Sequence, residues 1–580
     1  MEGYKSKIGK RQMLQYMGGM YENSLVVYRE YLGNSCDAVE EALRLNIIPN
    51  RKHANIAVTI DTFNKRITIH DVGIGIAKAD IGPCLVSVAS SNKYKKNLVG
   101  RFGIGRLNGA KYCDRIVYET SVKGEDIKST LVWDVAEARR LCEDDAEDLD
   151  TPEIIDKVTH RLPEQPEDVD SHYCKVTLEN VNDPHLMDED AVRQYISEIV
   201  SVDYSLEFKD NAISPSLDLP MNADYEERFN NLWVYEVTVN NHPVEKTYRS
   251  EFNDKHLGVI QCFTLIDDKT QEELAWGWFS LNRTAEQLND LPFSFIRARH
   301  HNFQIGDSSF LTKYHKNTTA ANYIIGELHI THPNITPTGS RDGFEAGADL
   351  RRLETALRKK LLKIYKQYDN ASHFRSNVIG VVAKLNTEIA GIKLSLKEEP
   401  DPDEKAKLKD KIKKAVAERR NALGLSSKYQ TYFEDNGLWA IVEDIVDAVN
   451  ESIIEQYNNK AKVQKADAQI PELKLEEFKP NAPKPASPNT PSSQPNGDTD
   501  PKQPDNPSGK NIPGSNTTPE GLPTTPTEPP VPNEMDDYKS LSTVERALVR
   551  KFLSVINSMS DLPEKQKTKL KARLRKKIIK

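Results

Sequence analysis

The stretch Glu30-Tyr31-Leu32-Gly33-Asn34-Ser35-Cys36-Asp37-Ala38 decides the fold of this 580-residue chain. Apolar residues recur at helical spacing through positions 21–45, which predicts a helix. Glu30, Asn34 and Asp37 are separated by four and three residues, so a helix carries them on one face. An amide oxygen suits a magnesium ion, and a carboxylate one turn away can polarise a water molecule. The pattern therefore favours a polar site that can activate water.

Two glycine-containing motifs follow in a fixed order. Asp71-Val72-Gly73-Ile74-Gly75 comes directly after a strand-like segment, residues 66–70. An aspartate at a strand end can accept a hydrogen bond from an adenine amino group, and glycines let the backbone approach a base. Gly100-Arg101-Phe102-Gly103-Ile104-Gly105 then opens a helical segment, whose backbone N–H groups suit phosphate oxygens. With no Gly-x-x-x-x-Gly-Lys-Ser/Thr loop in the sequence, the motifs predict an adenine-nucleotide pocket that is not a P-loop.

The three motifs together resemble the GHKL ATPases, in particular the ninety-kilodalton heat-shock chaperones and the microrchidia proteins. Residues 30–38 resemble the first ATPase helix of the chaperones, and residues 100–105 resemble the end of their ATP lid. The resemblance implies ATP and Mg²⁺ as ligands, Glu30 as the general base and Asn34 as the magnesium ligand. The nucleotide contacts that it implies are Asn34, Asp37, Asp71, Gly73, Gly75, Gly100, Arg101, Phe102, Gly103, Ile104 and Gly105.

Three further candidates depend on longer-range matches. Arg341, in Thr338-Gly339-Ser340-Arg341-Asp342, resembles the chaperone middle-domain arginine that reaches the γ-phosphate, and a surface loop with an unrelated ion pair is the alternative. Lys93, within the predicted lid 76–99, is either a phosphate contact or a solvated lysine. The chaperones have a threonine near the adenine where this chain has Cys174. Thr177 is the other candidate there, although a pleated strand points it to the opposite face.

Composition and periodicity predict several domains. They indicate an α/β domain (1–185), an α/β middle domain (186–345), a helical region (346–465), a disordered proline-rich linker (466–537) and a basic helical unit (538–580). The resemblance implies that the first of these is an α/β sandwich ATPase domain of Bergerat type. The acidic segment 136–170 is predicted to be a solvated surface loop. The basic run Arg297-Ala298-Arg299-His300-His301 could face a phosphate, a domain interface or nucleic acid.

The bulk properties indicate an ordinary soluble protein. The net charge is −8, no apolar run is long enough to span a bilayer, and the six cysteines are scattered, which together favour the cytoplasm and no membrane partner. The leading hypothesis is a slow ATPase that acts as a conformational clamp, with ATP-driven homodimerisation and protein clients. A microrchidia-like DNA-binding ATPase and a non-hydrolysing ATP-binding scaffold are the alternatives.

Overall fold

The computed structural model describes residues 9, 23–51, 54–87, 105–144, 148–248, 256–288, 294–398, 400–461 and 472–479. All of them belong to one compact unit, Met1–Ser487. Most of the predicted linker and the whole of the predicted C-terminal unit lie outside the described residues, and so does the lid segment 88–104.

A twisted sheet forms the centre of the N-terminal domain, with the order β5-β4-β3-β7-β2-β1-β8-β9 and β6 beside β4. Its strands are β1 (Asn55–Asp61), β2 (Arg66–Asp71), β3 (Arg115–Ser121), β4 (Ile127–Asp134), β5 (Thr159–Arg161), β6 (Gln165–Pro166), β7 (Tyr173–Glu179), β8 (Glu236–Val239) and β9 (His242–Pro243). Neighbouring strands are antiparallel except β1 and β8, which are parallel. Buried residues alternate with more exposed ones along β1 and β2, as expected for a sheet with one covered face.

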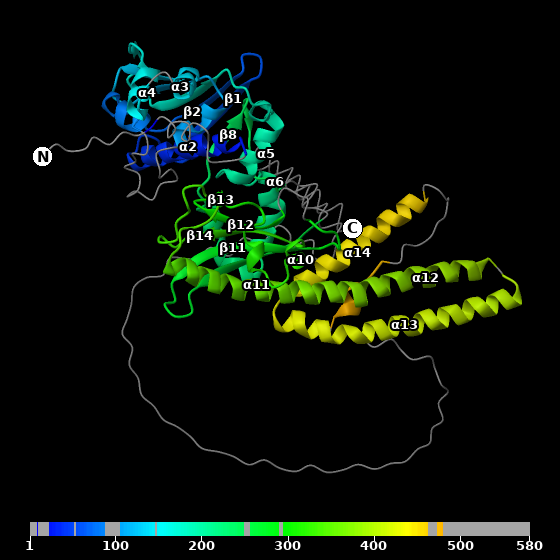
Figure 1. Ribbon diagram of the computed structural model, residues 1–580. Coiled ribbons are helices and arrows are strands. Elements are labelled where there is room, and N and C mark those ends of the chain that lie inside the picture. Colours follow the sequence, from blue (N-terminus) through cyan, green and yellow to red (C-terminus); the bar gives the residue numbers. More distant parts are fainter. Residues whose placement is uncertain are drawn as a thin grey trace, which may run out of the picture. The chain divides into compact units, whose positions relative to one another are not determined.

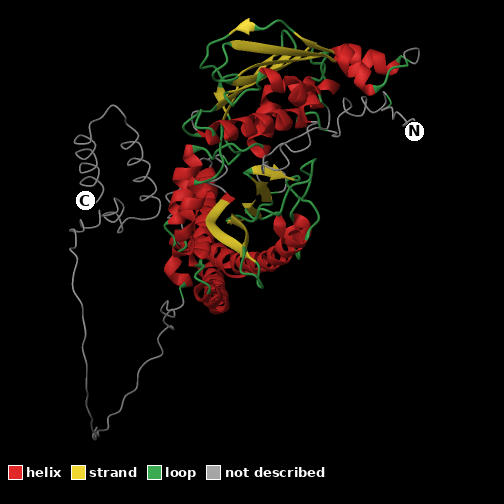
Figure 2. Cartoon of the chain, turned by 90° about the vertical axis from the view of Figure 1, so that its left-hand side faces the viewer, coloured by secondary structure: helices red, strands yellow, loops and turns green. Residues whose placement is uncertain are grey.

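The covered face carries the helices α2 (Val26–Arg44), α3 (Val135–Glu143), α4 (Thr151–Val158) and α5 (Glu189–Ile199). Figure 2 shows the sheet of this domain with helices packed against it. Residues from α2, α3, α4 and α5 share one hydrophobic core with the sheet strands. This arrangement confirms the predicted α/β class of the N-terminal domain.

The acidic segment is the first departure from the sequence-based prediction. It was predicted as a solvated loop, but it contains α3, α4 and two short strands, and Leu141 and Ile154 are completely buried in the sheet core. Asp150 and Glu153 form a capping box that starts α4. The charges line the outer faces of two amphipathic helices, so the high acidic content concealed their apolar faces.

The hairpin β8–β9 is the second departure. Asn240 and Asn241 form its turn, and both residues have positive φ angles of 48° and 66°. The hairpin does not belong to the middle sheet, however, because β8 pairs with β1 from Asn55↔Glu236 to Val58↔Val239. The domain boundary placed near residue 185 therefore separates strands that share one sheet.

The middle region is built on a five-stranded sheet with the order β10-β11-β14-β12-β13. Its strands are β10 (Leu257–Ile266), β11 (Glu273–Asn282), β12 (Phe295–His300), β13 (Phe303–Ile305) and β14 (Ile324–Ile330). Short helices precede it, namely α6 (Leu206–Phe208), α7 (Ser214–Leu217) and α8 (Glu226–Asn230), and α10 (Thr318–Ala321) lies before β14.

The helical region consists of α11 (Ala348–Phe374), α12 (Gly380–Lys397), α13 (Pro402–Asp435) and α14 (Trp439–Ala461), as Figure 1 shows. Leu353, Leu357, Leu361 and Ile364 of α11 join the same hydrophobic core as β10, β11 and β14. The regularly spaced leucines of α11 are thus used for packing within the chain. No helix in the described part of the chain is both long and apolar enough to cross a membrane.

Candidate functional site

Helix α2 presents the first motif beneath the N-terminal sheet. Its apolar residues Tyr28, Leu32, Cys36 and Val39 are buried in the core, which fixes the rotation of the helix. Asp37 is almost fully buried, whereas the side chain of Glu30 is 12% exposed and Asn34 is of intermediate exposure. The motif therefore runs from a buried carboxylate to a more accessible one along a single helix face, as the spacing predicts.

The end of β2 holds the second motif against this helix. Asp71 is buried, and its Oδ1 accepts hydrogen bonds from the backbone N–H of Gly73 at 2.9 Å and of Cys174 at 3.3 Å. The backbone N–H of Ile74 donates to the carbonyl oxygen of Ala38 at 3.2 Å. The Asp71 carboxylate is thus oriented by backbone groups, and its loop is joined to the end of the first motif.

The structure explains the two glycines of this loop by packing within the protein, whereas the sequence analysis explained them by the approach of an adenine base. A Cβ atom at Gly73 would lie 2.4 Å from the Cβ of Ala38, and a Cβ at Gly75 would lie 1.9 Å from the carbonyl oxygen of Ser121. Gly75 also has a φ of +70°, which favours glycine. Both glycines are required for the loop to pack against α2 and β3, whether or not a base approaches them.

The last residue of the third motif reaches Glu30. Gly105 begins a 3₁₀ helix, Gly105–Lys111, and a Cβ there would lie 2.9 Å from Oε2 of Glu30. The end of the predicted lid therefore meets the proposed base directly. The other predicted lid residues, Lys93, Gly100, Arg101, Phe102, Gly103 and Ile104, lie outside the described residues.

The register of β7 identifies the neighbour of Asp71. Asp71 is paired with Cys174, and Thr177 is paired with Thr68 three positions further along. The Thr177 hydroxyl lies 3.4 Å from that of Thr68, on the face of the sheet opposite Asp71. This geometry does not support Thr177 as a nucleotide contact, and Cys174 occupies the position beside the buried aspartate.

The loop Thr338–Gly343 of the middle region contacts α2. Arg29, which the sequence analysis did not single out, donates from Nη2 to the carbonyl oxygen of Ser340 at 3.0 Å. The same side chain forms an ion pair with Glu30 at 3.0 Å. The pKa of the Asp342 carboxyl is lowered chiefly by hydrogen bonds from the Thr338 and Ser340 hydroxyls. The charge of Arg29 contributes a weaker effect in the same direction. Two segments about three hundred residues apart in sequence are therefore joined beside the proposed base.

Arg341 is buried in this loop with a φ of 53°. Its guanidinium carbon lies 5.2 Å from the ring centroid of Phe303. Burial raises the pKa of the Cys36 thiol well above its ordinary value, and the nearby charge of Arg341 partly opposes that shift. Arg341 therefore lies within electrostatic reach of α2, but its side chain packs on the middle region.

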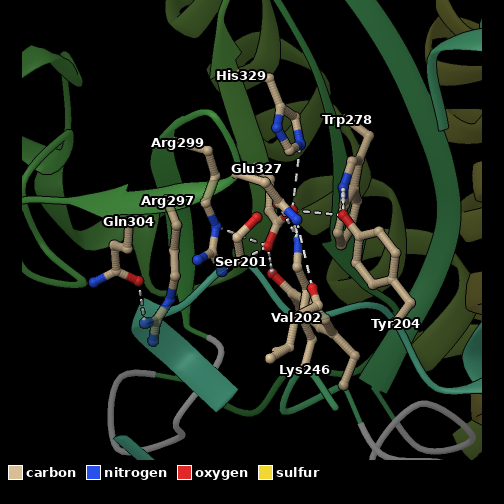
Figure 3. Close-up of polar contacts among 12 residues, drawn as sticks. Ser201, Val202, Tyr204, Lys246, Trp278, Arg297, Arg299, Gln304, Glu327 and His329 are labelled. Carbon is tan, nitrogen blue, oxygen red and sulfur yellow. Dashed lines mark hydrogen bonds and ion pairs between the residues drawn. The ribbon is translucent and has the colours of Figure 1, made fainter. Parts of the chain in front are cut away.

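The basic run at 297–301 is buried and joins the two regions. Glu327 of β14 is completely buried and accepts hydrogen bonds from Arg299 Nη2 at 2.7 Å, Lys246 Nζ at 2.6 Å and Tyr204 OH at 2.5 Å (Figure 3). Arg299 also donates to the carbonyl oxygen of Glu198, at the end of α5. Of the three predicted alternatives, the structure supports the domain interface.

Burial and the neighbouring charges together set the protonation states around this carboxylate. Desolvation lowers the pKa of Lys246 to about 7 and that of His329 to about 4. Beside the Arg299 and Lys246 cations, the Glu327 carboxyl has a pKa well below its ordinary value, although burial acts in the opposite direction. We refer to Glu327, Lys246, Arg299, Tyr204, Tyr248 and His329 as the Glu327 cluster.

The chemistry at α2 fits an adenine nucleotide with Mg²⁺. Asp71 provides a buried, backbone-oriented acceptor for an exocyclic amino group, and Asn34 provides a neutral oxygen for a cation shared with phosphates. Glu30 provides a partly accessible carboxylate one helical turn from Asn34. The ion would neutralise phosphate charge when bound.

Comparison with known proteins agrees with this chemistry. Residues 21–164 match the family model described as histidine kinase-, DNA gyrase B-, and HSP90-like ATPase. The chain is 26% identical over 149 residues to the chaperone protein HtpG of Buchnera aphidicola, covering 22% of this chain and 24% of that one. It is also 26% identical over 175 residues to heat shock protein 90-6, mitochondrial, of Arabidopsis thaliana, covering 27% and 21% respectively. The chain thus spans about a quarter of the length of these curated relatives.

Proposed function

We propose that this chain, whose N-terminal domain is a GHKL-type ATPase domain, binds ATP with Mg²⁺ and hydrolyses it slowly to drive a conformational clamp. The observation that carries the proposal is the convergence on α2 of three separate segments. Asp71 is attached through its loop to Ala38, Gly105 touches Glu30, and Ser340 is hydrogen-bonded to Arg29. A change at the nucleotide can therefore reach both the lid and the middle region through one helix.

In the proposed complex, Asp71 accepts a hydrogen bond from the adenine amino group. Asn34 would hold Mg²⁺, which would neutralise phosphate charge, and the motif from Gly100 to Gly105 would supply backbone N–H groups to the phosphate oxygens. Glu30 takes a proton from the attacking water molecule, and general-base assistance of this kind contributes about 10²–10⁴-fold to a rate. Arg341, whose loop touches α2, reorients toward the γ-phosphate and stabilises the charge that develops during transfer.

We further propose that ATP binding promotes association of two N-terminal domains and that hydrolysis releases them. Binding can shift a conformational equilibrium only through a difference in affinity between the two states. The Arg29–Ser340 contact, which links the ATPase helix to the middle region, is a candidate for a contact that differs between them. The relatives named as chaperones make protein clients the first class of substrate to test.

The test is magnesium-dependent phosphate release by the full chain, measured beside Glu30→Ala. We expect the variant to bind ATP in calorimetry and to lose activity by about 10²–10⁴-fold. Undiminished phosphate release would show that Glu30 is not the base. Sedimentation with a non-hydrolysable ATP analogue tests the clamp separately, since a monomer at saturating analogue would contradict nucleotide-driven dimerisation.

A further inference from the structure

The α12–α13 hairpin carries a concentration of positive charge that the proposed ATPase chemistry does not use. The two helices lie side by side and antiparallel (Figure 1), and the side chain of Arg419 donates to Asn386 at 2.6 Å across them. Between Lys405 and Arg420 there are eight lysines and arginines and only two carboxylates, although the whole chain has a net charge of −8. Most side chains of this segment are exposed.

The lysines are placed by a simple repeat. In α13, Leu408 and Ile412 are partly buried and each is followed by an exposed lysine. In α12, buried Ile392 and partly buried Leu396 are likewise each followed by an exposed lysine. One residue rotates a side chain by about 100° around a helix, so each lysine lies to the same rotational side of the packed residue before it. Because the helices are antiparallel, this rotation brings both sets of lysines to the same face of the hairpin.

We define this face as the basic face. All its residues are exposed. On α13 its three lysines are spaced by four residues, and one arginine follows them further along the helix. Its members are Lys393, Lys397, Lys405, Lys409, Lys413 and Arg420.

The two carboxylates of this part of α13 lie off the basic face. Asp410 is engaged by Lys414 at 2.9 Å, one turn along the outer side of the helix. Glu418 immediately precedes the partly buried Arg419, so it lies to the opposite rotational side. The other face of the hairpin is therefore mixed in charge, whereas the basic face carries one sign only.

The composition of the hairpin indicates which kind of polyanion the basic face fits. At a rise of about 1.5 Å per residue, the α13 part of the basic face extends over roughly 22 Å from Lys405 to Arg420. Residues 391–420 contain no aromatic side chain on which an unpaired base could stack, and no Asn or Gln that could read a base edge. A row of cations without aromatic or amide side chains matches the phosphates of a double helix.

We propose that the basic face of the α12–α13 hairpin binds the phosphate backbone of duplex DNA without sequence preference. The proposal does not depend on ATP binding or hydrolysis. Its electrostatic origin requires that the affinity fall steeply with salt concentration.

The experiment measures the anisotropy of a labelled duplex of mixed sequence, titrated with the full chain at several KCl concentrations without nucleotide. The test variant is Lys405→Gln/Lys409→Gln/Lys413→Gln. The matched control is Lys407→Gln/Lys411→Gln/Lys414→Gln, which removes the same charge from the mixed face of the same helix. We expect the test variant to bind at least tenfold more weakly, with a salt slope smaller by about 0.9 for each lost phosphate contact. We expect the control to stay within about threefold of wild type, because surface charges that touch no phosphate act only through screened attraction.

Three results would overturn the proposal. Equal losses in both variants would assign the affinity to net charge rather than to this face. Wild-type affinity in the test variant would place DNA binding elsewhere, for example in the lysine-rich segment 565–580. Binding of an acidic polypeptide that duplex DNA does not compete away would point to a protein partner instead. Circular dichroism of both variants establishes that the helices are intact.

Discussion

The guanidinium of Arg29 forms an ion pair with the carboxylate of Glu30 at 3.0 Å and at the same time donates to the backbone of the loop that carries Arg341. One side chain therefore contacts both the proposed base and the middle-region loop that carries Arg341. Its position beside Glu30 on α2 means that any displacement of the loop changes the surroundings of the base. This relationship leads to the first prediction.

Arg29→Ala should lower the rate of ATP hydrolysis while leaving ATP affinity within about threefold of wild type. The substitution removes the group that orients the Glu30 carboxylate, and small misplacements of a reacting group cost up to about 10²-fold. Steady-state phosphate release and calorimetric binding separate the two effects. Arg44→Ala is the matched control, because Arg44 lies on the same helix and its ion pair with Glu41 is on the surface. An Arg29 variant with an unchanged rate would remove this side chain from the coupling.

Asp71→Asn should weaken ATP binding by roughly 10- to 150-fold, which corresponds to the loss of a charge-assisted hydrogen bond of about 1.5–3 kcal/mol. The asparagine keeps an Oδ1 acceptor for the backbone N–H groups of Gly73 and Cys174, so the loop should retain its conformation. Calorimetry with ATP measures the change. Asp61→Asn, at the end of β1, serves as the control, and wild-type affinity in Asp71→Asn would contradict the adenine assignment.

The local part of the site was predictable because it depends on residues a few positions apart in the sequence. The interval from Glu30 to Asp37 fixes a helix face, and β2 leading into Asp71 fixes a strand end. The pleat of β7 predicts that Cys174 and Thr177 lie on opposite faces of the sheet. The strand register then places Cys174, not Thr177, beside Asp71. These features depend on neighbouring residues and therefore can be read from sequence.

The non-local part was not predictable. The pairing of β8 with β1 joins residues about 180 apart, and the contact of Arg29 with Ser340 joins residues 311 apart. Nothing in a local window specifies such partners. The acidic segment is an intermediate case, because the Asp150–Glu153 capping box was a helix signal that the high charge obscured.

The geometry of the Glu327 cluster predicts that two substitutions in it destabilise the protein by different amounts. Glu327→Gln leaves the Lys246 and Arg299 cations buried without their shared carboxylate, and breaking a buried pair in this way costs about 3–5 kcal/mol. Lys246→Met should destabilise the protein by less than half as much, because Arg299 still pairs with Glu327. Urea unfolding followed by tryptophan fluorescence reports on the region, since Trp278 donates to Tyr204 at 3.0 Å. Equal losses for the two variants would show that the charges are not shared as the geometry indicates.

Asp444 of α14 should make the attachment of this helix weaken with rising pH. Its carboxylate is partly buried and accepts a hydrogen bond from the backbone N–H of Val259 in β10. Burial, partly opposed by that hydrogen bond and by Arg283, raises the pKa of Asp444 to about 7. A carboxyl with a raised pKa in the folded state contributes stability that is complete below its unfolded pKa of about 4. That contribution is lost as the pH rises through 7.

Asp444→Asn should therefore remove this part of the pH dependence. The amide keeps an acceptor for Val259 and stays neutral at every pH. The variant should therefore gain thermal stability relative to wild type as the pH rises from about 5 to about 8. Each unit of pKa difference corresponds to about 1.4 kcal/mol, so the gain should reach up to a few kcal/mol. Thermal midpoints of both proteins across this range measure the difference. Asp435→Asn, an exposed position at the end of α13, is the control and should shift no midpoint. A constant difference between Asp444→Asn and wild type would mean that this carboxyl is ionised throughout the range, and that α14 is held despite a partly buried charge.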